Sequence, residues 1–124
     1  MCLETCRAAT SEVGYLRSVA IDPEQPEVVV ISASSGPHSA YVVGRPDGRL
    51  YRRVTRERWE RVRDGWPEPA STIAPLLCAG AMAGELWAAD ERCVHRSDDG
   101  GSRWRRVAGY AGSSQHLRGL ALVR

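Results

Sequence analysis

The chain has 124 residues, of which 43% are hydrophobic and 26% are charged. This composition is typical of a soluble globular protein, and the length fits one domain. The formal net charge of +2 is too small to indicate a nucleic-acid or membrane partner by itself. No apolar run is long enough to cross a bilayer. The first residues contain an acid, Glu4, and lack the apolar run of a secretory signal, so we expect a cytoplasmic location.

The first half of the chain contains four segments that are typical of β-strands. Residues 16–21 alternate in hydrophobicity, and residues 27–32 form a run rich in β-branched side chains. The sequence Arg-Pro-Asp-Gly at residues 45–48 is a strong turn signal before a third predicted strand at residues 50–54. The fourth predicted strand covers residues 58–62.

The region from Arg49 to Asp64 also admits a helical interpretation. Leu50, Val54 and Val62 fall close to helical spacing, which would give an arginine-rich amphipathic helix. The Arg-Trp-x-Arg-Val pattern of this region occurs again after a Gly-Gly turn, through which a helix would not continue. Because the two copies should share one structure, we expect strands at both.

The second half of the chain repeats the pattern of the first. Its predicted strands cover residues 75–79, 85–89, 93–96 and 103–107. The segment that begins at Arg58 recurs from Arg103, so the offset is 103 minus 58, or 45 residues. Residues 16–21 have a further echo at 117–122. A repeat of about 40 to 50 residues with four short strands is typical of a propeller blade.

These patterns predict an all-β fold made of two four-stranded antiparallel propeller blades and a trailing strand, which is a partial β-propeller. The predicted divisions are an N-terminal segment or linker at residues 1–13, a first blade at 14–69, a second blade at 70–110 and a closing strand at 111–124.

The turn between the last two predicted strands, residues 97–104, has the pattern Ser-x-Asp-x-Gly-x-x-Trp. The Ser97 hydroxyl and the Asp99 carboxylate can accept backbone N–H groups and so hold a tight hairpin. Gly101 can supply a positive φ, and Trp104 can pack beneath the turn. We therefore predict a structural role for these four residues, and we expect Trp104 and Trp59 to be buried anchors.

This pattern resembles the Asp-box of the BNR repeat family, and residues 14–123 resemble two C-terminal blades of the sialidase-like and sortilin-like β-propeller superfamily. The first blade departs from the pattern, because Arg52 and Arg53 are near the serine position and the aspartate and glycine are missing. The resemblance implies either further N-terminal blades or a homo-oligomer in which two-blade copies close a ring.

The same resemblance raises the question of an enzyme. Sialidases of this superfamily use an arginine triad, a Tyr–Glu pair and an acidic Asp, spread over all the blades, and no Arg-Ile-Pro segment marks the first triad arginine here. We therefore assign no catalytic residue. The expected function is a non-catalytic module that serves as a binding or scaffolding surface for a protein or carbohydrate. The alternatives are part of a sialidase-like glycoside hydrolase and a self-assembling two-blade unit.

Basic and aromatic side chains gather in the third and fourth predicted strands. An anionic-ligand surface there would comprise Arg52, Arg56, Arg58 and Trp59. The alternative is a solvated blade edge, because nearby acids dilute the charge and alternating strands divide the arginines between two faces. A nucleic-acid partner is not expected.

No cofactor or metal is predicted. The chain has four cysteines, Cys2, Cys6, Cys78 and Cys93. Only the first two are close in sequence, so buried or N-terminal thiols are favoured over a four-cysteine metal site. Its three histidines, His38, His95 and His116, are far apart.

Overall fold

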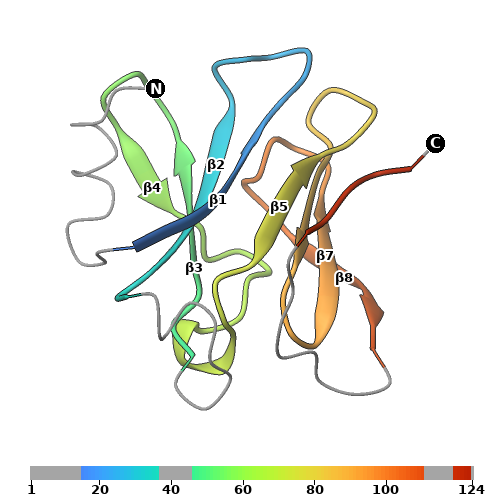
Figure 1. Ribbon diagram of the computed structural model, residues 1–124. Helices are drawn as coiled ribbons and strands as arrows, with labels where there is room; N and C mark the ends of the chain where they lie inside the picture. Colours follow the sequence, from blue (N-terminus) through green and yellow to red (C-terminus); the bar gives the residue numbers. More distant parts are fainter. Residues whose placement is uncertain (1–14, 37–45, 111–118, 124) are drawn as a thin grey trace.

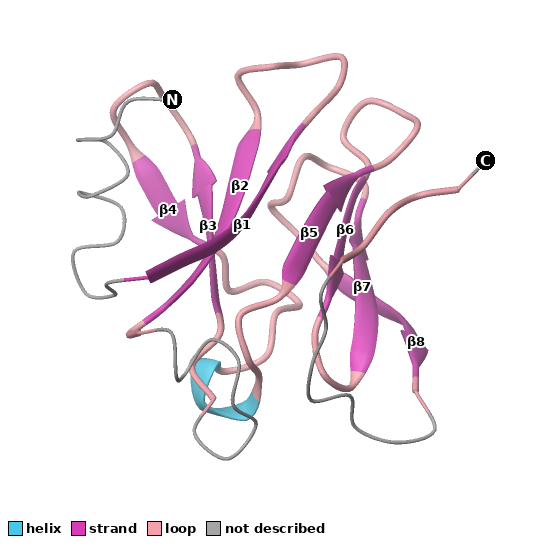
Figure 2. Cartoon of the chain, in the orientation of Figure 1, coloured by secondary structure: helices cyan, strands magenta, loops and turns pink. Residues whose placement is uncertain are grey.

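The computed structural model describes residues 15–36, 46–110 and 119–123 (Figure 1). These residues form two four-stranded antiparallel sheets and a single 3-10 turn (Figure 2), so the all-β prediction is confirmed. The elements are β1 (Tyr15–Ile21), β2 (Val29–Ser34), β3 (Arg49–Arg53), β4 (Trp59–Arg61), η1 (Pro69–Ser71), β5 (Leu76–Ala79), β6 (Leu86–Ala89), β7 (Cys93–Ser97) and β8 (Arg105–Gly109). Within the described ranges, no helix has the length and apolar character needed to cross a membrane.

Each sheet is a simple meander, with strand orders β1-β2-β3-β4 and β5-β6-β7-β8. All eight predicted strands are present, and their ends differ by a few residues from the predicted ones. The helical interpretation of Arg49 to Asp64 is wrong, because β3 and β4 pair across this region, with Arg53 opposite Trp59. A tight turn joins them, in which the backbone N–H of Val54 donates to the carbonyl of Arg58 at 2.8 Å.

The predicted closing strand at residues 111–124 lies partly outside the described residues. Residues 119–123, which are described, form no strand. They run beside β5 (Figure 1), where the backbone of Leu122 lies close to the Cys78 thiol. This contact is with a side chain rather than with the backbone of β5, so no ladder of hydrogen bonds forms.

The main core lies between the two sheets. Alternate residues of each sheet face the other sheet, and β1 lies against β5 (Figure 1). The buried cluster comprises Ala20, Val30, Leu50, Val62, Trp66, Leu77, Leu86, Ala88 and Trp104. The rings of Trp66 and Trp104 meet edge to face, with centroids 6.0 Å apart. This arrangement is favourable because the positive edge of one ring lies against the negative face of the other.

A second apolar cluster covers the opposite face of the first sheet. It contains Val29, Ile31, Ala33 and Tyr51, with Trp59 packed against it. Trp59 is only half-buried, so the prediction of a buried anchor there is wrong. Because Trp59 pairs with Arg53, it lies on the face of the sheet that points away from β5. Trp66, rather than Trp59, lies with Trp104 in the main core.

We predict that Trp104→Ala lowers the free energy of unfolding by about 3 to 5 kcal/mol, because it leaves a cavity in the core between the sheets. Urea unfolding followed by circular dichroism measures this loss. Trp87→Ala is the matched control, since Trp87 is half-buried outside this core. Equal losses for the two variants, or a loss below roughly 1 kcal/mol for Trp104→Ala, would contradict this account.

Candidate functional site

The turn from Ser97 to Trp104 is held by hydrogen bonds to two side chains. The Ser97 hydroxyl is buried, donates to Asp99 Oδ1 at 2.9 Å and accepts the N–H of Gly101 at 2.8 Å. The same carboxylate oxygen accepts the N–H groups of Ser102 and Arg103 at 3.1 and 3.0 Å. These bonds satisfy the backbone donors of the turn, which no strand partner can reach.

Glycine is required in this turn because it approaches the first sheet closely. Gly100 and Gly101 have φ values of 78° and 93°, where a side chain is strained. A Cβ on Gly101 would also lie 2.4 Å from Val30 Cγ2. The Trp104 indole N–H donates to the Gly101 carbonyl at 2.8 Å, beneath the turn. The backbone conformation of this turn is therefore held by four residues, namely Ser97, Asp99, Gly101 and Trp104.

A cleft of about 620 Å³ opens beside this turn, at the end of the first sheet. It is lined by Glu27 and Val28 from the loop after β1 and by residues 52–56. Arg52 Nε donates to the Gly100 carbonyl at 3.0 Å. Arg53 Nε donates to the Glu27 carbonyl at 3.1 Å. Both guanidinium groups are thus anchored to backbone oxygen atoms.

The charge of the cleft is positive. Arg52, Arg53 and Arg56 face a single carboxylate, Glu27, which leaves two positive charges in excess. Among the described residues, none of these three arginines forms a salt bridge, although many other arginines do. The anchoring bonds to neutral carbonyls position the arginines without neutralising them.

The structure brings together only part of the predicted anionic-ligand surface. Arg52 and Arg56 line the cleft. Arg58 pairs instead with the Glu60 carboxylate, and Trp59 packs on the far face of the sheet with a buried indole N–H that has no partner among the described residues. The predicted surface did not include Arg53, because neighbouring residues of a strand point to opposite faces of the sheet and Arg52 was assigned to it. Two consecutive arginines directly before a turn could have indicated this arrangement. At the end of a strand, side chains from both faces of the sheet can reach the same space.

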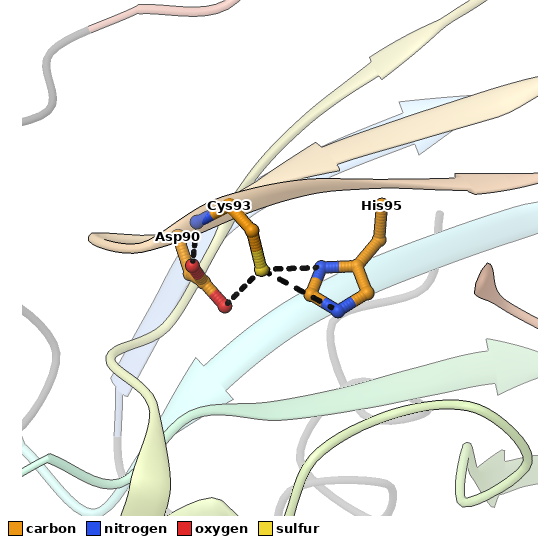
Figure 3. A group of neighbouring side chains, drawn as sticks. All are labelled: Asp90, Cys93 and His95. Atoms are coloured by element: carbon orange, nitrogen blue, oxygen red, sulfur yellow. Dashed lines mark hydrogen bonds between the residues drawn. The ribbon is translucent and has the colours of Figure 1, made fainter. Parts of the chain in front are cut away.

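A second group of side chains lies at the opposite end of the second sheet (Figure 3). Asp90, Cys93 and His95 are all buried, and one ligand atom from each lies within 4.8 Å of the others. The sequence analysis did not predict this group, because it considered the spacing of the cysteines and the spacing of the histidines separately. The short spacing Asp-x-x-Cys-x-His, across a turn and into β7, could have shown it.

The polar atoms of this group are close together and already hydrogen-bonded within the chain. Cys93 Sγ lies 3.8 Å from both ring nitrogens of His95 and 3.9 Å from Asp90 Oδ2. Asp90 Oδ1 accepts the N–H groups of Arg92 and Cys93, both at 2.8 Å, and Oδ2 accepts the Thr72 hydroxyl at 2.9 Å. Burial raises the pKa of the Cys93 thiol to about 11. The group therefore holds the turn between β6 and β7.

Among the described residues, the one further cysteine is Cys78. Cys78 is a half-buried free thiol, and burial raises its pKa. The remaining cysteines and histidines, Cys2, Cys6, His38 and His116, lie outside the described residues.

Comparisons with protein-family models, with curated proteins and with solved structures find no match to this chain. The resemblance carried by residues 97–104 therefore remains a prediction.

We predict that Ser97→Ala lowers the free energy of unfolding by about 1 to 3 kcal/mol, because it leaves the buried N–H of Gly101 without an acceptor. Ser102→Ala, in the same turn, is the control. The Ser102 side chain is exposed, so that variant should remain within about 0.5 kcal/mol of the parent. Matching denaturation curves for the two variants would refute the role of the Ser97 hydroxyl.

We also predict that His95 makes stability depend on pH. Burial lowers its pKa, the Asp90 carboxylate opposes this, and Arg106 adds to the lowering. The folded state thus favours the neutral ring. The stabilisation is complete above the unfolded pKa of about 6.5 and declines as the pH falls towards the lowered folded pKa, by at most about 1.4 kcal/mol per pH unit.

Urea unfolding of the parent and of His95→Gln between pH 7.5 and pH 5.0 measures this contribution. The variant should lose less stability than the parent over that range, because it has no ring to protonate at this position. Parallel pH profiles for the two proteins would show that His95 does not contribute.

Proposed function

We infer that the chain is a non-catalytic repeat module of the β-propeller type, and that it binds an anionic ligand in the arginine cleft. The repeat arrangement supports the first part. The two sheets share one strand order, pack face to face and place their first strands, β1 and β5, side by side (Figure 1). Residues 119–123 run beside β5 on its other side, where the first strand of a next blade would lie.

The position of residues 119–123 also bears on assembly. In a ring built from copies of this chain, β1 of one copy would have to lie beside β5 of another. Residues 119–123 already lie on that side of β5, where the backbone of Leu122 is close to the Cys78 thiol. We therefore do not extend the proposal to a ring of copies.

Binding is favoured over hydrolysis by the acids near the cleft. Glycoside hydrolysis uses two carboxylates on opposite sides of the scissile bond, and Glu27 is the single carboxylate among the described lining residues. Asp98 is engaged by Arg96 and Arg105. Asp99 is committed to the backbone of its turn. Neither aspartate is placed to act across the cleft from Glu27.

The observation that carries the proposal is the set of three guanidinium groups without salt bridges in one cleft. Arginine presents a planar fork of N–H donors that matches the oxygen atoms of carboxylate, sulfate and phosphate groups. Arg52 and Arg53 are held in place before a ligand binds. Ligand binding therefore costs less side-chain entropy than it would if these side chains were not held.

We predict that at least one small oxyanion compound raises the melting temperature of the chain, and that Arg56→Gln diminishes this shift because it removes a guanidinium group from the cleft. Thermal unfolding with a panel of sugar carboxylates, sulfates and phosphates measures it. A fluorogenic sialoside, incubated with the same protein, should not be hydrolysed.

Two outcomes would overturn the proposal. One is the absence of a shift with every anion of the panel. The other is hydrolysis of the sialoside that Glu27→Gln abolishes, which would assign a catalytic carboxylate to the cleft.

A further inference from the structure

We propose that the ligand of the arginine cleft is a small molecule with a terminal phosphate monoester, bound as the dianion. This inference rests on the proposed function, in which the cleft binds an anion. It goes further by naming the charge and the chemical class of that anion.

The excess charge of the cleft indicates a dianion. Three guanidinium groups and one carboxylate leave two positive charges. A carboxylate or a sulfate ester would neutralise one of them, and a phosphate monoester in its dianionic form neutralises both. Its three terminal oxygen atoms can also accept from several arginines at once.

The arginines offer donors in a suitable arrangement. The Nε of Arg52 and that of Arg53 are used by the Gly100 and Glu27 carbonyls. Both Nη groups of Arg52 have no acceptor in the described part of the chain, so an anion can accept from them. Arg53 is also held by its Nη2, which donates to the Pro26 carbonyl at 3.4 Å. Arg52 is thus fixed through one nitrogen and Arg53 through two, and the other N–H groups remain for the ligand.

Arg56 approaches the cleft from the turn between β3 and β4. Backbone bonds hold this turn, with the N–H groups of Val54 and Thr55 donating to the Arg58 carbonyl at 2.8 and 3.2 Å. The side chain of Arg56 itself is exposed. It can therefore reach a bound anion without any change in the backbone.

The size and walls of the cleft indicate an ester rather than free phosphate. Its volume of about 620 Å³ lies within the range of small-molecule sites. Val28 and Val54 contribute apolar lining. A phosphate group fills only part of this space, and the remainder can take a body the size of a sugar.

The ionisation of phosphate gives the proposal a pH signature. A phosphate monoester loses its second proton with a pKa of about 6, whereas a sulfate ester has no corresponding ionisation. The charged groups that face the ligand are Glu27 from the loop after β1, Arg52 and Arg53 from β3, and Arg56 from the following turn. Affinity for the phosphate ester should therefore fall from pH 7.5 to pH 5.0, and affinity for the sulfate ester should not fall in parallel.

Titration calorimetry with glucose 6-phosphate, glucose 6-sulfate, glucuronate and inorganic phosphate tests the inference on the full chain. At pH 7.5 we expect glucose 6-phosphate to bind about tenfold more tightly than the other three, and to lose most of that advantage at pH 5.0. Arg56→Gln should weaken its binding by about tenfold. Arg58→Gln, with the same change of charge in the same turn, should leave the affinity within about twofold, because Arg58 pairs with Glu60 outside the cleft.

The contrary outcomes separate the two proposals. If glucose 6-sulfate or glucuronate bound as tightly as glucose 6-phosphate, the inference of a phosphate ligand would be wrong. The proposal that the cleft binds an anion would still hold. If inorganic phosphate bound as tightly as glucose 6-phosphate, the inference that the ligand is an ester would be wrong. Equal weakening by Arg56→Gln and Arg58→Gln would show attraction by net charge alone, and no binding of any of the four compounds would reject the cleft itself.

Discussion

The close approach of the Gly100–Gly101 turn to the first sheet is the contact on which both the fold and the cleft depend. The turn belongs to the second sheet, yet a Cβ on Gly101 would lie 2.4 Å from Val30 of the first sheet. The carbonyl of Gly100 accepts from Arg52. The residues that hold the turn therefore also hold the two sheets together and position one wall of the cleft.

A chain of hydrogen bonds extends this contact across the loops at the same end of the molecule. Asp22, buried in the loop after β1, accepts the N–H of Gly84, and the carbonyl of Gly84 accepts the N–H of Gly100 at 3.0 Å. Arg52 of the first sheet donates to the Gly100 carbonyl, and this bond links the chain of hydrogen bonds back to the first sheet. Because each sheet and its loops supply donors and acceptors that the other lacks, neither sheet alone would present the same cleft.

The two ends of the second sheet use buried polar groups in the same way. At one end the Ser97 hydroxyl and the Asp99 carboxylate accept backbone donors, and at the other end Asp90 accepts those of Arg92 and Cys93. These carboxylates satisfy buried or turn N–H groups that have no strand partner, and so they hold the conformation of the turns. The arginines of the cleft differ, since only Glu27 among the described lining residues opposes their three charges, and for this reason we propose that binding occurs there.

The sequence by itself determined the strands and the turn at Ser97, because alternation, β-branched runs and turn residues act within a few neighbours along the chain. It did not determine that Trp66 rather than Trp59 joins Trp104, since that depends on which face of β4 meets the second sheet. Nor did it show that Arg53 shares a cleft with Glu27, which the pairing of β1, β2 and β3 brings together. Strand register and sheet packing are non-local, so only the tertiary structure decided them.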